Sequence, residues 1–124
     1  MGLSSLQSVA FATPGGESSP PSSGRPIDLV HLARQTLGDR AIEQEVLALF
    51  LQQACVVRER IGKATPDERR SLAHALRGSA AGIGAFALAD CAARIEKNPA
   101  EVAMVPALAA CIDAVRDFIA SISR

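Results

Sequence analysis

Hydrophobic residues recur every three or four positions from about residue 26 onward, which is the spacing of one face of an α-helix. The pattern predicts a short helix over about 27–36 and a second that follows Asp39 and runs to about Ile61 or Gly62. A third begins at Pro66 and is weakened or ended by Gly82 and Gly84, a fourth covers about 86–97, and a last one ends near residue 122. The positions expected to face the core are Ile42, Val46, Leu49, Phe50, Val57 and Ile61 in the second segment, Leu72, Leu76, Ala80 and Ile83 in the third, Leu88, Cys91, Ala92 and Ile95 in the fourth, and Leu108, Cys111, Ile112, Val115, Phe118, Ile119 and Ile122 in the last.

The boundaries between these segments carry specific start and stop signals. Asp39 is a candidate N-cap for the second helix, and Gly38 precedes it as a stop for the first. The run Thr65-Pro66-Asp67-Glu68 has the form of a capping box, with proline at the first helical position. Four amphipathic helices with short connections predict an all-α fold, an antiparallel up-down four-helix bundle with the short N-terminal helix capping one end.

The composition of the 124 residues agrees with one small helical domain. There is no Trp or Tyr and only four Phe, while alanine, the best helix former, is abundant. Thirteen basic residues balance thirteen acidic ones, whereas a general nucleic-acid binder carries a basic surplus. No apolar run approaches the ~20 residues that span a bilayer. Nucleic acid and membrane are therefore not expected as partners.

Residues 1–24 differ from the rest of the chain. Fourteen of them are Gly, Ser or Pro, and Glu17 is the one charged residue. Such a composition cannot bury enough surface to fold alone, which predicts a flexible tail ahead of a helical domain over 25–124. Docking of Val9-Ala10-Phe11 on the domain stays open as an alternative.

The three cysteines, Cys55, Cys91 and Cys111, form no CxxC motif and no Cys/His pair. An odd number of cysteines in apolar, helix-like stretches is typical of buried reduced thiols in a cytoplasmic protein. A metal site is not expected, because one histidine without nearby ligands is too few.

The chain has two histidines, and helical geometry distinguishes them. His31 lies among apolar residues of the short first helix and is interpreted as a surface or packing residue. His74 lies about 200° around the axis from Leu72 and about 160° from Leu76, at 100° per residue. Its side chain is therefore predicted to point away from the core into solvent.

Small and basic residues surround His74 on the same helical face. Arg70, Arg77, Gly78 and Ala81 fall within about 60° of it. A neutral imidazole is a nucleophile, guanidinium groups stabilise a phosphoryl group, and a mid-helix glycine costs ~1 kcal/mol unless another surface must approach. We interpret the face as a phosphoryl-accepting histidine in a protein–protein interface. His74 is the acceptor, Arg77 and more weakly Arg70 stabilise charge, and the partner-binding positions are Ser71, Gly78 and Ala81.

A basic run surrounds this face in the sequence. Between residues 58 and 77 there are three acidic residues and six basic ones. The run predicts a locally basic surface that complements an acidic partner and speeds association. The alternative is an ordinary solvated helix face. The basic residues are Arg58, Arg60, Lys63, Arg69, Arg70 and Arg77.

The run HALRGSAAGIGA over 74–85 resembles the signature of histidine phosphotransfer (HPt) domains, H-x-[LI]-[KR]-G-[SA]-[SA]-x-x-[LIV]-G-[AL]. Every position of that signature is satisfied, with Arg77 where the family more often has lysine. The resemblance extends over about residues 26–122 in the number and length of helices and in the place of the histidine.

The resemblance implies a function in a multistep two-component phosphorelay. His74 would take a phosphoryl group from the aspartyl phosphate of a receiver domain and pass it to another receiver. Response-regulator receivers, and a hybrid histidine kinase, are the implied partners of a monomer. No ATP-dependent autokinase activity and no cofactor of its own are implied, with Mg²⁺ held by the receiver.

Three alternatives remain. A non-catalytic helical bundle could bind a receiver or kinase without carrying phosphate. A metal site is weaker, for the reason given above. A dimerising histidine kinase fragment usually has an acidic residue directly after the histidine, where this chain has Ala75.

Overall fold

The structure is a computed structural model that describes residues 25–123, and all regular structure in that range is helical. The predicted all-α class is confirmed. The predicted tail over 1–24, with its open docking alternative, lies outside the described residues. The five helices are α1 (Leu29–Gln35), α2 (Arg40–Arg60), α3 (Pro66–Ile83), α4 (Phe86–Lys97) and α5 (Val105–Ile122).

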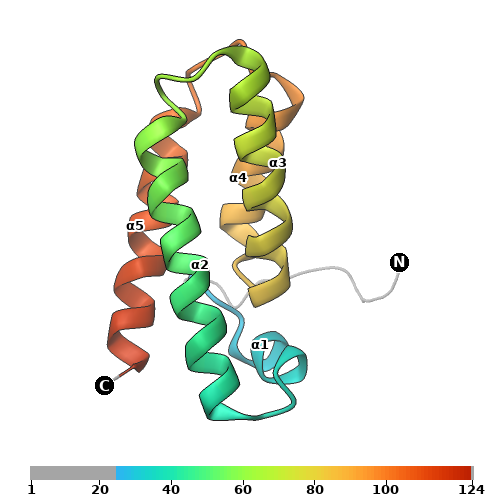
Figure 1. Ribbon diagram of the computed structural model, residues 1–124, viewed down its shortest axis with the longest axis vertical. Helices are drawn as coiled ribbons and strands as arrows, with labels where there is room; N and C mark the ends of the chain where they lie inside the picture. The colour runs from blue at the N-terminus through green and yellow to red at the C-terminus, as the bar shows by residue number, and fades with distance from the viewer. Residues whose placement is uncertain (1–24, 124) are drawn as a thin grey trace.

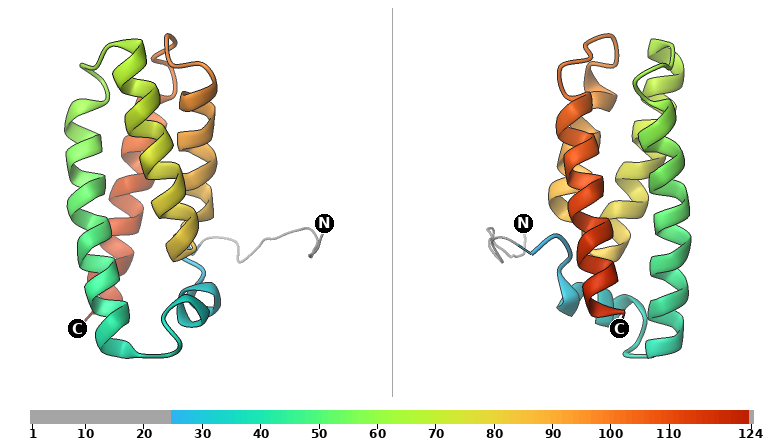
Figure 2. Two further views of the ribbon diagram at one scale, coloured as in Figure 1. Left: turned by 45° about the vertical axis from the view of Figure 1, so that its right-hand side comes forward. Right: turned by 90° about the vertical axis from the view of Figure 1, so that its left-hand side faces the viewer.

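The four longer helices lie side by side along the long axis of the domain, and α1 crosses one end of them (Figure 1). Helix α2 contacts α3 and α5, and α4 contacts the same two helices, so the four form a closed ring around the core. The further views in Figure 2 show the same arrangement. Helix α1 packs against α3.

The capping signals in the sequence act as predicted. The Asp39 side chain accepts a hydrogen bond from the backbone N–H of Ile42 at 3.1 Å. The Thr65 hydroxyl accepts from the Glu68 N–H at 3.2 Å, and the Glu68 carboxylate accepts from the Thr65 N–H at 3.1 Å. This reciprocal pair fixes the residue at which α3 begins, and the burial of its apolar stripe then sets which residues of α3 face outward.

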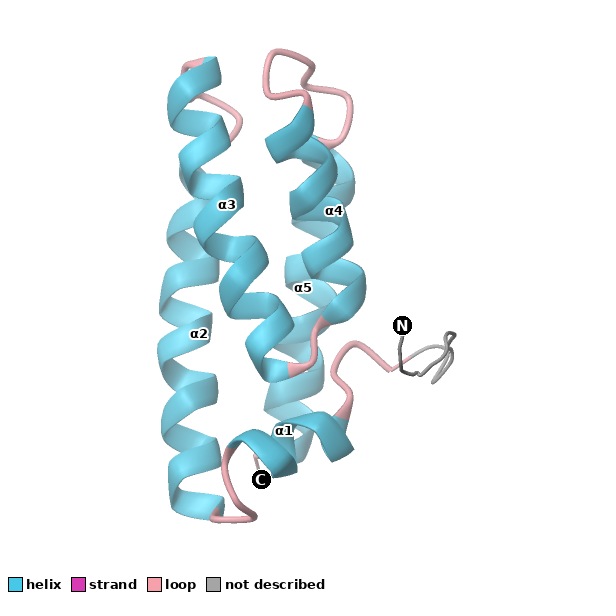
Figure 3. Ribbon diagram, turned by 90° about the vertical axis from the view of Figure 1, so that its right-hand side faces the viewer, coloured by secondary structure: helices cyan, strands magenta, loops and turns pink. Residues whose placement is uncertain are grey.

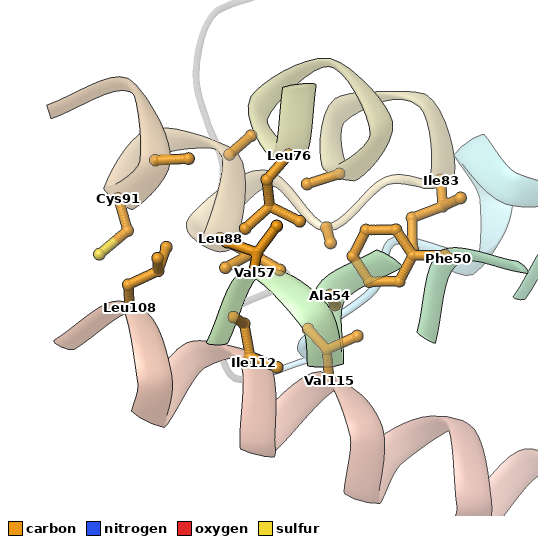
Figure 4. Close-up of a cluster of buried hydrophobic side chains, with 14 of the residues drawn as sticks. Phe50, Ala54, Val57, Leu76, Ile83, Leu88, Cys91, Leu108, Ile112 and Val115 are labelled. Atoms are coloured by element: carbon orange, nitrogen blue, oxygen red, sulfur yellow. The ribbon is translucent and has the colours of Figure 1, made fainter. Parts of the chain in front are cut away.

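The core is built from the inner faces of the four long helices. Figure 4 shows side chains of α2, α3, α4 and α5 meeting there, among them Val57, Leu76, Leu88 and Ile112. The inward positions predicted for α3, α4 and α5 are largely confirmed. The exceptions are half-buried residues at the margin of the core: Leu72, Cys111, Phe118 and Ile122.

The predicted facing of α2 is wrong in part. Ile42 and Leu49 were expected in the core, but they are 46% and 60% exposed. Leu47 and Ala54 are buried instead. Helix α2 carries two overlapping apolar stripes with the same helical spacing of three and four residues, and packing against the neighbouring helices selects the one that faces the bundle. That buried stripe consists of Leu47, Phe50, Ala54, Val57 and Ile61.

The cysteines do not share one environment. Cys91 is buried as predicted, and burial raises the pKa of its thiol to about 11, with the neighbouring Cys111 adding to the shift. Cys111 is half-buried, whereas Cys55 is exposed, which corrects the expectation of a buried thiol. Cys55 lies on α2 beside Ala54, one position away from the buried stripe, so its side chain points outward.

The turn between α3 and α4 fixes both the hairpin and the position of α1 (Figure 3). Gly84 has φ +87°, and a Cβ there would lie 2.8 Å from the backbone oxygen of Asp28. The Asp28 N–H donates to the Gly84 oxygen at 2.9 Å, while the Asp28 carboxylate caps α1 by accepting from the N–H groups of Val30 and His31. Glycine is required at this turn for its conformation and for the close approach of Asp28.

Candidate functional site

His74 lies in the middle of α3 on the side away from the core, as the helical geometry predicted. Its side chain is 65% exposed. Leu76, two residues on, is fully buried, so the same turn of helix anchors the domain and presents the imidazole. The position of the ring is therefore set by the packing of α3.

A carboxylate from the neighbouring helix contacts the histidine. Oε2 of Glu96, on α4, lies 2.7 Å from Nδ1 of His74. The other oxygen of the same carboxylate, Oε1, accepts a hydrogen bond from Nε of Arg77 at 2.7 Å. Nη2 of Arg77 lies 3.2 Å from His74 Nδ1. These three residues form the His74–Glu96–Arg77 cluster.

The ionisation of Glu96 determines the tautomer of His74. The hydrogen bond with His74 is the largest cause that holds the pKa of the Glu96 carboxyl below its usual range; partial burial opposes the shift, and Arg77 reinforces it. The carboxylate is therefore ionised at neutral pH, and its stabilising contribution is lost only as the pH falls through that lowered pKa. An ionised carboxylate can only accept, so the shorter contact, with Glu96 at 2.7 Å, assigns the proton to Nδ1. The longer approach of Arg77 Nη2 is then a close contact and not a hydrogen bond, because a guanidinium only donates.

When the ring is neutral, this tautomer leaves Nε2 of His74 without a proton. The lone pair of Nε2 is then available for attack on an electrophile, on the part of the ring remote from Glu96. As in a catalytic triad, a carboxylate beside Nδ1 orients the histidine and stabilises the positive charge that the ring gains on reaction. The cluster can thus prepare one nitrogen of an exposed imidazole as a nucleophile.

The two predicted arginines occupy different positions. Arg77 is in contact with Glu96 and the Nδ1 side of the ring. Arg70 is exposed, and its guanidinium lies 3.4 Å from a carboxylate oxygen of Asp67, one turn earlier on α3. The structure therefore places Arg77, but not Arg70, in direct contact with His74.

The three predicted partner-binding positions also differ. Gly78 is exposed, and a Cβ there would meet nothing within 4 Å, so the domain itself does not require glycine at this position. Ala81 is half-buried against the core. Ser71 is exposed and lines a surface hollow between the end of α2 and the start of α3, together with Lys63 and Glu68.

The predicted basic surface is divided by pairing and burial. Arg58 points to α5, where Nε and Nη2 donate to the carboxylate of Asp113 at 2.9 and 2.8 Å. Arg69 is buried and donates to backbone oxygens. Since Arg77 is paired with Glu96, the basic run does not form a single surface around His74. Arg69 follows the spacing of the buried stripe of α3, which explains why its side chain turns inward.

Glu96 is the site residue that the sequence analysis missed. It lies on another helix, 22 residues after His74, and belongs to no motif around the histidine. The short α3–α4 turn was the available signal. In an antiparallel hairpin, residues equally distant from the turn lie opposite each other, and His74 is eleven residues before Ala85 while Glu96 is eleven after it.

Two further observations concern the described part of the chain. Among residues 25–123, no group of three or more His, Cys, Asp or Glu side chains is placed to hold a metal ion. No helix in the same range has the length and apolar character to cross a membrane.

Comparison with known protein families gives a match over more than half of the chain. The family model of the Hpt domain matches residues 45–118, which run from α2 through most of α5 and include the whole His74–Glu96–Arg77 cluster. Neither the curated proteins nor the solved structures gave a match. The matched segment covers more than half of the sequence, and it agrees with the resemblance of the run around His74. The chain therefore belongs to the Hpt domain family.

Proposed function

We propose that this domain is a phosphoryl carrier of a multistep phosphorelay, in which His74 accepts the phosphoryl group of a receiver's aspartyl phosphate and passes it to another receiver. Membership of the Hpt family implies histidine phosphotransfer in phosphorelays in general. The observation that carries the assignment to His74 is its 2.7 Å contact with Glu96, which leaves Nε2 free on an exposed helix face.

The chemical step uses the tautomer assigned above. The Nε2 lone pair attacks the phosphorus of the aspartyl phosphate in line, the P–Nε2 bond forms, and the P–O bond to the aspartate breaks. The aspartate leaves as a carboxylate. The ring keeps its Nδ1 proton and becomes positively charged, so the Glu96 carboxylate stabilises the product ring. Transfer to the second receiver is the same step in reverse.

The arginines contribute in two ways. Arg77 is held by Glu96, so its main effect is to fix that carboxylate against the ring. Arg70 has only the long contact with the highly exposed Asp67. Because such an exposed pair contributes little energy, the Arg70 guanidinium is free to turn toward the transferring phosphoryl group.

The proposed docking surface for receivers extends from His74 across to α2. Gly78 gives the closest approach to the helix backbone, and an apolar groove lies further along between α2 and α3. The exposed Leu49 lines this groove, and the exposed Val56 follows two turns later on α2. An apolar surface beside an exposed nucleophile suits a protein partner more than a small molecule. The groove is lined by Val46, Leu49, Phe50, Gln53, Ser79, Gly82 and Ile83.

Replacing Gly78 by alanine is expected to separate stability from function. The new Cβ meets nothing in the domain, so the free energy of unfolding should rise by up to about 1 kcal/mol. Forcing a methyl group into a close interface typically costs 1–3 kcal/mol, so transfer from a phosphorylated receiver should slow by about tenfold or more. Denaturant unfolding and transfer kinetics measure the two effects. The control Ala75→Gly lowers helix stability without adding atoms to the face, and unchanged transfer in Gly78→Ala would contradict the docking surface.

Replacing Glu96 by glutamine is expected to slow phosphorylation of His74 by about tenfold, because a hydrogen bond to a charged group is stronger than a neutral one by about 1 kcal/mol. Glutamine retains an oxygen that can accept from Nδ1 but loses the charge that stabilises the phosphorylated ring. The rate of phosphoryl acceptance from phosphoramidate measures the effect. Asp90→Asn is the matched control, because Asp90 is an exposed acid on the same helix. Equal rates in the two variants would show that Glu96 has no part in the step.

The same proposal includes the helix topology, the oligomeric state, the location and the partners of the domain. The helix ring is an antiparallel up-down bundle with α1 as the cap of one end, and the domain acts as a cytoplasmic monomer with receivers and a hybrid kinase as partners. The contacts of α2 and α4 with both α3 and α5 support this topology. The domain needs no cofactor and has no autokinase activity, and the Mg²⁺ of the reaction belongs to the receiver.

The experiment that tests the proposal needs no partner. The protein is incubated with phosphoramidate, a small phosphoryl donor, and its intact mass is recorded at neutral and at acidic pH. One phosphoryl group that is stable at neutral pH and lost in acid supports a phosphohistidine carrier. If neither phosphoramidate nor phosphorylated receivers modify the protein while a receiver still binds it, the domain is a non-catalytic binding module instead.

A further inference from the structure

Arg69 is the most deeply buried charged residue in the described part of the chain, with 5% of its surface exposed. It lies on α3, five residues before His74, on the side that faces the other helices. Its three nitrogens donate to three backbone oxygens: Nε to Ile61 at 2.9 Å, Nη2 to Ala64 at 2.7 Å and Nη1 to Pro99 at 2.6 Å.

These three oxygens lie in two connections that meet at one end of the bundle. Ile61 is the C-cap of α2, Ala64 precedes the N-cap of α3, and Pro99 follows the C-cap of α4. Within residues 25–123, no carboxylate lies within ion-pair distance of Arg69. The positive charge is compensated by carbonyl dipoles at the ends of α2 and α4, which carry partial negative charge.

The contact with Pro99 links Arg69 to the site. Glu96 lies three residues before Pro99, in the last turn of α4. Its hydrogen bonds with His74 and Arg77 are made between partly exposed side chains, and exposed ion pairs contribute too little to hold two helices in register. The backbone must therefore place Glu96. The Gly84 turn and buried residues such as Ile95 set the position of α4 along α3, and Arg69 adds a hydrogen-bonded link from α3 to the chain just after the end of α4.

We propose that Arg69 is a positioning residue for the phosphorylation site, which holds the C-terminal end of α4 so that Glu96 stays within hydrogen-bond distance of His74 Nδ1. This inference rests on the proposed function for its biological meaning. The effect of the Arg69 contacts on the protonation state of the His74 ring is a property of the unphosphorylated domain.

The test compares Arg69→Met with wild type, using ¹⁵N NMR at a pH where the His74 ring is neutral. In wild type, the proton of the neutral ring is expected to be mainly on Nδ1. In Arg69→Met, the fraction of rings protonated on Nδ1 should fall toward the fraction found in Glu96→Ala. Phosphorylation by phosphoramidate should slow by a similar factor, up to about tenfold. Arg69→Met in the Glu96→Ala background should cause no further change in ring state, because both act through the same carboxylate.

The control is Arg58→Met, which removes another arginine that links two helices, α2 and α5, away from the His74–Glu96–Arg77 cluster. It should leave the ring state unchanged even if it lowers the melting temperature. Where Arg69→Met does not fold, Arg69→Lys replaces it, since lysine keeps the charge but cannot reach three oxygens as a fork. A folded Arg69 variant with the wild-type ring state overturns the proposal. The ring state is read without any phosphoryl donor, so this outcome is distinct from failure of the proposed function.

Discussion

Replacing His74 by glutamine is expected to abolish phosphoryl acceptance completely and to leave the fold intact. Glutamine has no nucleophilic nitrogen, so no phosphoryl bond can form at this position. The side chain of His74 is mostly exposed, and surface substitutions usually change stability by no more than about 0.5 kcal/mol. Intact mass after incubation with phosphoramidate measures acceptance, and circular dichroism measures the fold.

The second histidine supplies the matched control for this variant. His31 lies on α1, where its ring contacts Phe86 edge-on with 5.1 Å between centroids, outside the His74–Glu96–Arg77 cluster. His31→Gln should therefore accept a phosphoryl group as wild type does. Acceptance that survives in His74→Gln, or that is lost in His31→Gln, would move the phosphorylation site away from His74.

Replacing Leu76 by aspartate is expected to unfold the domain. Leu76 is fully buried between α3 and the other long helices, as Figure 4 shows. Loss of a buried leucine typically costs 2–5 kcal/mol, and an unpaired buried charge adds several more. The sum approaches or exceeds the ~5–15 kcal/mol that usually stabilises a domain. Thermal unfolding followed by circular dichroism should show no cooperative transition, or one at a much lower temperature.

Ala75→Asp places the same charge on the neighbouring residue of α3 as a control. Ala75 is exposed, so its carboxylate stays hydrated and only helix propensity is lost, about 0.7 kcal/mol at most. A shift of a few degrees in melting temperature follows from that cost. Similar melting curves for the two variants would mean that the outward face of α3, and with it the exposure of His74, is assigned incorrectly.

Residues with local signals could be predicted from the sequence. The reciprocal hydrogen bonds of Thr65 and Glu68 depend on four consecutive residues, and the exposure of His74 follows from its angle to Leu76. Both are properties of a single helix. For the same reason the buried faces of α4 and α5, each with one dominant apolar stripe, were predicted largely correctly.

Residues whose environment depends on packing between helices were predicted less well. Helix α2 has two apolar stripes, and only the position of its neighbours decides that Leu47 is buried while Leu49 is exposed. Arg69 was counted with the surface charges because arginine is rarely buried, yet two carbonyl oxygens from the connection before α3 and one from the connection after α4 make its burial favourable. The position of Arg69 does fit the buried stripe of α3, but its charge argued against burial, and no local pattern separates the two stripes of α2.

Only the α3 part of the candidate site was named from the sequence. The face of α3 gave His74 and Arg77, but the carboxylate that fixes the tautomer comes from α4. Recognising Glu96 required treating α3 and α4 as a hairpin with a known turn rather than as two separate helices. Once the turn at Gly84 is placed, the pairing of His74 with Glu96 follows from counting residues.

The two-residue turn at Gly84 and Ala85 also has a consequence for how the gene can change. His74 is eleven residues before Ala85, about 16 Å along the helix axis. One inserted codon at the turn would shift α4 against α3 by ~1.5 Å and rotate it by ~100°, which would carry the Glu96 carboxylate away from the imidazole. In related proteins that keep this pairing of histidine and carboxylate, insertions and deletions should therefore be rare at this turn. They should be commoner in the longer connection between α4 and α5, except next to Pro99, whose oxygen accepts a hydrogen bond from Arg69.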